Sequence, residues 1–300
     1  MNQAKAFSRI VTDETLQENA QHGSPLFPLQ YYDEDIWDFE FHCVDWHWHP
    51  ELEYMFVASG QAVCFIGNEK AVVKQGSGIL INHHVIHRFE AQSSTKIPNV
   101  VYSPLLPGAE NSIIYRKYLL PFISNGPDFI LFTPETGWQK ECIRLMQEVF
   151  DAQEAVEDAE LLTVIHLLGF WKEIHRNCRP YSGENRTRKP GQARLQIMMR
   201  YIQENYQGHV SLEDVAASVH VGKSTALQIF HDGIHQSPVS YLIQYRLKQA
   251  ARLLAATEKS IRVIAEETGF ESSTYFCRRF RELYGTTPKE YRRQSGASAD

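Results

Sequence analysis

Three histidines and one glutamate in the first third of the chain have the residue types and spacing of a metal or ligand site. His47 and His49 are separated by one residue, Glu53 follows four residues after His49, and His87 lies further along the chain. Side chains of a regular strand alternate between its two faces, so residues 47, 49, 51 and 53 would share one face. Two imidazoles and a carboxylate, joined by a third imidazole from another strand, could bind a first-row transition metal.

The same four side chains have two other interpretations. They could bind an organic ligand through hydrogen bonds inside a mostly apolar cavity, without metal. They could also belong only to the packing of the domain. Neighbouring residues are expected to play other parts: Trp46 and Trp48 alternate away from the histidines and should pack, and Glu51 is either a rim carboxylate or a solvated charge. We expect His83 and His84 at the rim.

The elements around this cluster are short and rich in β-forming residues. From about residue 30 to residue 104, apolar runs such as 53–57, 61–66 and 79–81 are separated by glycine-containing turns, which predicts a sandwich or barrel. The pattern His47-x-His49-x-x-x-Glu53, with Gly60 seven residues later and then Gly76-x-Gly78 and His87, resembles the two motifs of the cupin barrel. The resemblance implies a barrel that holds a small ligand, with a divalent transition metal as a candidate cofactor.

Two copies of one helix-turn-helix pattern occupy the last third of the chain. They run over residues 211–231 and 260–281, and their starts are 49 positions apart. Ser211 with Asp214 three residues on predicts a capping box at the first support helix. We expect Val221-Gly222 to make the first turn and Gly269-Phe270 the second, because glycine admits a positive φ.

In each copy the second helix should present polar residues outward. Between the copies, residues 238–256 form one predicted helix of about 28 Å, close to the roughly 34 Å that separates successive major-groove faces of DNA. A rigid connector of that length could set two reading helices one turn apart. Polar and arginine side chains there could reach base edges. The candidate DNA-binding residues are Lys223, Ser224 and Gln228 in the first reading helix, and Ser273, Thr274, Arg278 and Arg281 in the second.

This part of the chain resembles the AraC/XylS-type bacterial transcription regulators. The resemblance covers about 100 residues and implies that the two reading helices enter adjacent segments of the major groove. The first reading helix departs from the family pattern at Ala226, Gln228 and His231, so its sequence preference could differ. The motif consists of Ser237-Pro238-x-x-Tyr241-Leu242-x-x-x-Arg246-Leu247-x-x-Ala250, Ile264-Ala265-x-x-x-Gly269-Phe270, Tyr275-Phe276-x-Arg278-x-Phe280 and Gly285-Thr286-Thr287-Pro288-x-x-Tyr291-Arg292.

The strand and helix patterns favour a multidomain α+β protein, and the charges divide it into an acidic body and a basic end. The chain has 300 residues and a net charge of −6, yet residues 192–293 carry 14 Lys and Arg against 10 Asp and Glu, a net of +4. Such a segment suits an anionic partner. Five cysteines without a C-x-x-C pair, no long apolar run and no signal-peptide core predict a cytoplasmic protein that does not contact a membrane.

The predicted organisation has five parts. Two helical patterns between residues 138 and 177 are expected to mediate dimerisation, and the barrel and the DNA-reading domain are expected on either side of a linker rich in Pro, Gly and basic residues. The parts are an N-terminal arm (1–28), a cupin-like sensing and dimerisation domain (29–178), a linker (179–191), a DNA-binding domain (192–293) and a tail (294–300).

The leading hypothesis is a bacterial transcriptional regulator, an activator or a repressor, whose binding to double-stranded DNA is modulated by a small effector in the barrel. That effector could be a carbohydrate. The protein would be a homodimer, would contact RNA polymerase if it activates, and would have no catalytic residues. Two alternatives are a cupin metalloenzyme, such as a dioxygenase or isomerase, and a DNA-binding protein whose barrel only dimerises. The metalloenzyme leaves the paired helix-turn-helix units unexplained.

Overall fold

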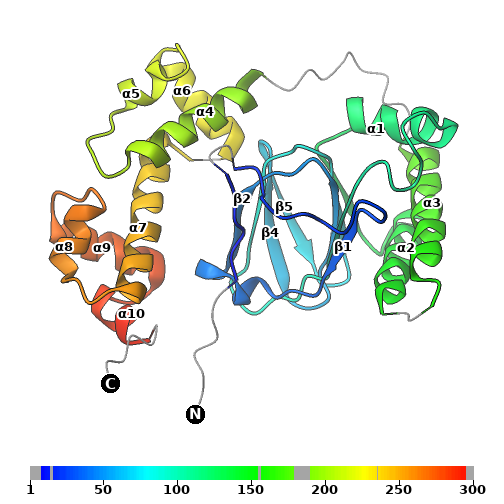
Figure 1. Ribbon diagram of the computed structural model, residues 1–300, viewed down its shortest axis with the longest axis horizontal. Helices are drawn as coiled ribbons and strands as arrows, with labels where there is room; N and C mark the ends of the chain where they lie inside the picture. Colours follow the sequence, from blue (N-terminus) through cyan, green and yellow to red (C-terminus); the bar gives the residue numbers. More distant parts are fainter. Residues whose placement is uncertain (1–7, 14–15, 155–156, 179–189, 235, 295–300) are drawn as a thin grey trace. The chain divides into compact units, whose positions relative to one another are not determined.

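The computed structural model describes residues 8–13, 16–154, 157–178, 190–234 and 236–294 of the chain (Figure 1). Contacts divide it into two compact units that meet in the sequence near residue 188. Most of the predicted linker, residues 179–189, lies outside the described residues, as do residues 1–7 of the predicted arm and 295–300 of the tail. The first helix of the second unit begins at Pro190, inside the predicted linker.

The first unit is built on two antiparallel sheets, so the predicted β-rich domain is confirmed. One sheet has the strand order β1-β8-β3-β6-β9 and the other has the order β2-β7-β4-β5. Two short 3-10 turns, η1 (Ile36–Asp38) and η2 (Glu40–His42), precede β2. The strands are β1 (Leu29–Tyr32), β2 (Cys43–His47), β3 (Leu52–Phe56), β4 (Gln61–Ile66), β5 (Glu69–Lys74), β6 (Gly78–Ile81), β7 (His87–Glu90), β8 (Asn99–Tyr102) and β9 (Phe129–Phe132).

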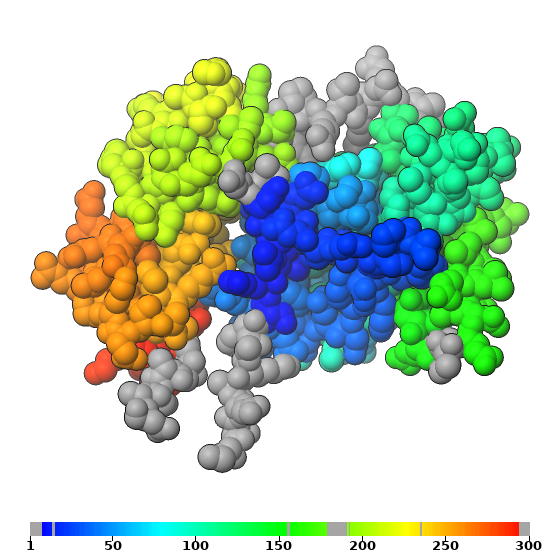
Figure 2. All heavy atoms as spheres, viewed as in Figure 1, coloured from blue at the N-terminus to red at the C-terminus, as the bar shows by residue number. Residues whose placement is uncertain are grey.

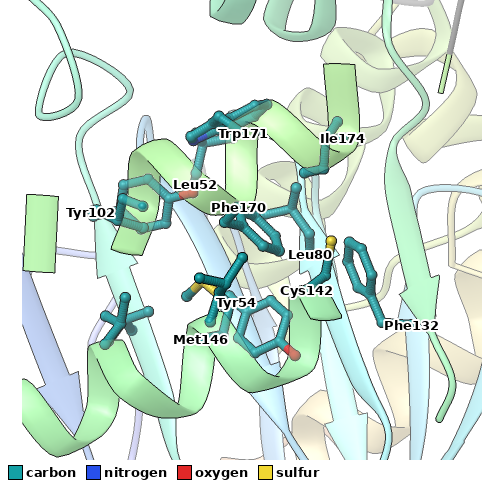
Figure 3. Packing of buried hydrophobic residues seen from close by; sticks show 14 of the residues in the cluster. Leu52, Tyr54, Leu80, Tyr102, Phe132, Cys142, Met146, Phe170, Trp171 and Ile174 are labelled. Carbon is teal, nitrogen blue, oxygen red and sulfur yellow. The ribbon is translucent and has the colours of Figure 1, made fainter. Parts of the chain in front are cut away.

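The five-stranded sheet is buried on both faces. Its inner side chains, among them Met55 and Ile79, pack in the core between the sheets, whereas Leu52 and Tyr54 belong to a second core under the helices. Figure 3 shows Phe170 of the covering helices packed near Tyr54, with ring centroids 5.6 Å apart. The helical elements of this unit are η3 (Tyr115–Leu119), α1 (Leu120–Asn125), α2 (Gly137–Gln153) and α3 (Ala159–Asn177).

The described part of the N-terminal segment is attached to the barrel, whereas the sequence favours a loose arm. Trp48 donates its backbone N–H to the carbonyl of Leu16 at 3.0 Å, and Glu18 donates its own to the carbonyl of Trp48 at 2.9 Å. Leu16 and His22 are buried. In Figure 2 the dark blue residues lie across the surface of the barrel. The weak periodicity of this segment reflects isolated backbone bridges instead of regular structure.

The regular elements among the described residues of the second unit are all helices, and two of their predicted features are confirmed. Ser211 and Asp214 form the predicted capping box, and the connector helix has the predicted bounds. No helix among the described residues is long and apolar enough to cross a membrane. The helices are α4 (Pro190–Asn205), α5 (Leu212–Ala217), α6 (Lys223–Ile234), α7 (Pro238–Ala256), α8 (Ile261–Glu267), α9 (Ser273–Tyr284) and α10 (Pro288–Gln294).

The two helix-turn-helix turns use different residues for the left-handed backbone. Gly269 has φ +83° as predicted, but Gly222 does not have a positive φ. In the first helix-turn-helix copy His220 takes the left-handed conformation, with φ +55°. It lies 49 positions before Gly269, which takes this conformation in the second copy. The prediction for Gly222 is therefore wrong by two residues. Histidine tolerates this region better than most side chains do, and Gly222 instead precedes the first residue of α6.

Gly269 and Gly222 give a matched pair of alanine variants. An added Cβ at Gly269 would lie 2.5 Å from the carbonyl oxygen of Tyr206, in addition to the left-handed strain, so G269A should destabilise the second unit by more than about 1–2 kcal/mol. G222A has an ordinary φ and open space, so it should stabilise the unit by about 0.4–1 kcal/mol. Calorimetric melting of the full chain measures both; equal shifts would contradict this account.

Candidate ligand site and DNA-reading helices

The four residues of the predicted barrel site converge, although they do not share one strand. His47 ends β2 of the four-stranded sheet, whereas Glu53 lies on β3 of the five-stranded sheet. His49 is in the segment between these strands, where the chain crosses from one sheet to the other. His87 begins β7 and pairs directly with His47 in the register. The single-strand geometry predicted from the spacing is wrong, but the crossing still brings all four side chains to one interior position.

We name His47, His49, Glu53 and His87 the barrel cluster. One potential ligand atom of each residue lies within 4.8 Å of all the others, and all four are buried. The Glu53 carboxylate is 2.9 Å from His87 Nε2 and 3.4 Å from His49 Nε2. Two ligands about 2.1 Å from one ion lie at most about 4.2 Å apart, so small movements would complete a coordination shell.

The outer side of the cluster fixes which nitrogen of each ring faces inward. Nδ1 of His47 lies 2.7 Å from the carbonyl oxygen of Asp45, and Nδ1 of His87 lies 2.8 Å from that of Val85. A carbonyl only accepts, so both Nδ1 atoms carry a proton and each ring turns its Nε2 toward the interior of the cluster. Such outer-shell partners are typical of metal-binding histidines.

The pKa shifts of His47 and Glu53 suit a bound cation. Burial, with the neighbouring imidazoles, lowers the pKa of His47 to about 3, so this ring is neutral at pH 7. Burial raises the pKa of Glu53, but hydrogen bonds from His49 and His87 outweigh it and hold the pKa below its usual range. Neutral imidazoles and an ionised carboxylate are the forms that bind divalent transition metals. The donor set therefore fits such an ion.

The cluster opens on a cavity of about 350 Å³, whose other walls the sequence did not reveal. These walls carry Glu18, His22, Tyr32, Glu34 and Asn99. Two of these residues come from the N-terminal segment, which has no periodicity that could have indicated them. Burial raises the pKa of Glu34 to about 7, so this carboxyl can donate as well as accept hydrogen bonds near neutral pH.

His22 connects these walls to the cluster. Its Nδ1 lies 2.9 Å from the Tyr32 hydroxyl, its Nε2 lies 3.4 Å from Glu18, and its ring centroid is 5.4 Å from that of His49. A ligand in the cavity would thus meet the barrel cluster on one side and polar groups on the other. Trp46 and Trp48 are buried as predicted, and His83 and His84 are half-buried.

The first predicted reading helix, α6, has its candidates on the exposed face. Ala226 and Phe230 are buried, whereas Lys223, Ser224 and Gln228 are exposed. Two of these candidates have acidic partners: Lys223 forms an ion pair with Glu213, and Gln228 donates to Asp232.

The second predicted reading helix, α9, offers more positive charge. Thr274, Arg278 and Arg281 are exposed and Ser273 is half-buried, while Phe276 and Phe280 pack inward. The Arg278 guanidinium lies 5.3 Å from the centroid of the Tyr275 ring. These side chains are free of the core and have the chemistry to contact bases and phosphates.

Comparisons with known proteins agree with both domains. Residues 215–294 match the model of a helix-turn-helix domain, and residues 42–101 match that of a cupin domain. The chain is 22% identical to the uncharacterized HTH-type transcriptional regulator YdeC of Bacillus subtilis, over 95% of this chain and 99% of that protein. It is 24% identical to the melibiose operon regulatory protein of Escherichia coli, over 83% of each chain.

A solved structure is also similar to part of the chain. The AraC-type DNA-binding domain of a Chromobacterium violaceum regulator is 29% identical, with a TM-score of 0.34 over 36% of this chain and 96% of that one. The chain thus contains a cupin domain and a helix-turn-helix domain, and over most of its length it is similar to proteins named as transcriptional regulators.

Proposed function

We propose that this regulator acts in the cytoplasm as a homodimer that binds double-stranded DNA through α6 and α9 and responds to a small ligand in the barrel. The observation that carries the proposal is one chain with both a cavity that polar groups line in part and two exposed reading helices. Effector binding would alter DNA binding through a coupling free energy between the two sites. An activator of this kind would also contact RNA polymerase.

The cavity supports a ligand with several polar groups, held with the help of a divalent transition metal. Carboxylate, amide and hydroxyl groups line one side, which suits a ligand with several hydroxyls. One relative regulates the melibiose operon by name, which supports a carbohydrate. His47, His49, Glu53 and His87 would hold the metal, which would supply a Lewis-acidic centre. The relatives are transcriptional regulators, which favours a sensor over an enzyme.

Removal of Arg278 tests the reading role of α9. R278A should weaken binding to a duplex selected from a randomised pool by about 1–3 kcal/mol and relax preference at one base pair, if the guanidinium reads a base. Arg262 on α8 is an exposed arginine outside the reading helices, so R262A is a charge-matched control. Competition binding with single-base substitutions measures both; a loss that is uniform across sequences would assign Arg278 to phosphate contact instead.

Metal binding by the barrel cluster is tested on the full chain with Zn²⁺, Ni²⁺ and Co²⁺. At about 100 times its Kd, a metal that binds only the folded protein stabilises it by about 2.7 kcal/mol, and chelator should reverse the shift in Tm. H47A should abolish the shift, whereas H83A, a rim histidine outside the cluster, should retain it. An equal metal response in both variants would place the ion elsewhere.

The dimer is proposed to form through α3. Leu161, Leu162 and Ile165 are exposed there, whereas other apolar residues of α3, such as Phe170, pack in the core beside the sheet. An exposed row of this kind is typical of an association surface.

Charge on this row tests the dimer. The double variant L161E/I165E should be a folded monomer by sedimentation at micromolar concentration, while V72E, at an exposed apolar residue of β5, should leave the dimer intact. A wild-type chain that is already monomeric under these conditions would refute the proposal.

A further inference from the structure

One arginine of the connector helix binds backbone groups of the preceding half of the helical unit. Arg246 lies near the middle of α7, and its Nε donates to the carbonyl of Tyr206 at 2.7 Å. Its Nη2 donates to the carbonyl of Gly208 at 2.7 Å. Both carbonyls lie just beyond the C-terminal end of α4, which packs against α5 and α6. The guanidinium thus holds the chain that leads from α4 into the first helix-turn-helix unit.

The same arginine also contacts the turn of the second helix-turn-helix unit. An added Cβ at Gly269 would lie 2.8 Å from Arg246 Nε and 2.5 Å from the Tyr206 carbonyl oxygen. The backbone at Gly269 therefore packs directly against the hydrogen bond between Arg246 Nε and the Tyr206 carbonyl. The guanidinium lies 5.9 Å from the ring centroid of Phe270, whose ring is 5.1 Å from that of Phe276 on α9.

These contacts form a short chain of packed groups between the two halves of the helical unit, one carrying α6 and the other carrying α9. On the first side, Gln203 of α4 donates to the Tyr241 hydroxyl of α7 at 2.7 Å, and the Tyr241 ring is 6.0 Å from that of Phe230 on α6. On the second side, Phe270 leads within three residues to the start of α9. A single side chain thus touches structure that carries each reading helix.

We infer that Arg246 is a positioning residue that fixes the separation and rotation of α6 relative to α9, and so sets which spacing of two DNA segments the protein accepts. A helix of 19 residues alone fixes its own length, about 28 Å, but not the angle at which each half is attached. Arginine suits this role because its planar fork holds two acceptors in a fixed geometry, which a lysine ammonium does not. The inference rests on the proposed two-segment reading of DNA.

The test compares two duplexes and the full-length protein. The first duplex is selected from a randomised pool by the wild-type chain, and the second has one base pair inserted between its two protected segments. One base pair shifts the second segment by about 3.4 Å and about 35° around the DNA axis. A rigid reader loses the benefit of engaging both segments, so wild-type affinity should fall about tenfold or more.

In R246K and R246Q the affinity for the selected duplex should fall, and the penalty of the insertion should shrink to about two- to threefold, because looser halves adapt to either spacing. R252A removes an exposed arginine of the same helix and should keep the wild-type ratio between the two duplexes. A role in stability alone would lower the binding-competent fraction and thus weaken both duplexes equally. An unchanged ratio in folded R246K and R246Q would overturn the inference. A wild-type footprint on one segment only would instead overturn the proposed two-segment reading.

Discussion

The barrel site depends on the way the chain crosses between its two sheets at residues 48–51. Before the crossing His47 points inward from the four-stranded sheet, and after it Glu53 points inward from the five-stranded sheet. A carboxylate and three imidazoles would be costly to bury without partners. The backbone carbonyls of Asp45 and Val85 satisfy the outer nitrogens of two rings, which leaves the inner nitrogens facing one another. The fold therefore concentrates ligand atoms at one buried position beside the cavity.

Packing on both sides of the five-stranded sheet keeps that point in place. Along β3 the side chains alternate, so Leu52 and Tyr54 bind the covering helices while Glu53 and Met55 face the interior. The helices thus hold the strand that presents the carboxylate. Through the same strand, the proposed dimer surface of α3 is linked by a continuous core to the proposed ligand site. A ligand that shifts β3 would act on this core, which is close-packed and transmits strain.

Sequence reasoning succeeded where a local pattern dictates the structure. The bounds of α7, the capping box at Ser211 and the outward faces of the reading helices follow from helical periodicity and caps, and the structure confirms them. It failed where tertiary context decides. The polar walls formed by Glu18 and His22 come from a segment held by isolated bridges, which has no period to detect. The first turn places His220, not a glycine, in the left-handed region, which costs histidine only modest strain, and the following Val221 N–H donates to the Ala216 carbonyl at 3.1 Å.

The two reading helices differ in the charge that they offer to DNA, and this difference makes the connection between them important. Helix α6 offers neutral polar groups and one lysine, which pairs with Glu213, whereas α9 offers two arginines, Arg278, which lies 3.9 Å from Glu282, and Arg281. Attraction to DNA phosphates supplies most of the sequence-independent affinity, and α9 therefore contributes more of it than α6 does. Helix α6 can add to the preference between DNA sequences only if it reaches its major-groove segment at a defined distance and angle from α9. A rigid attachment at Arg246 would hold α6 at that distance and angle. Because α6 is then already oriented when α9 binds, it loses little further orientational entropy on entering the groove.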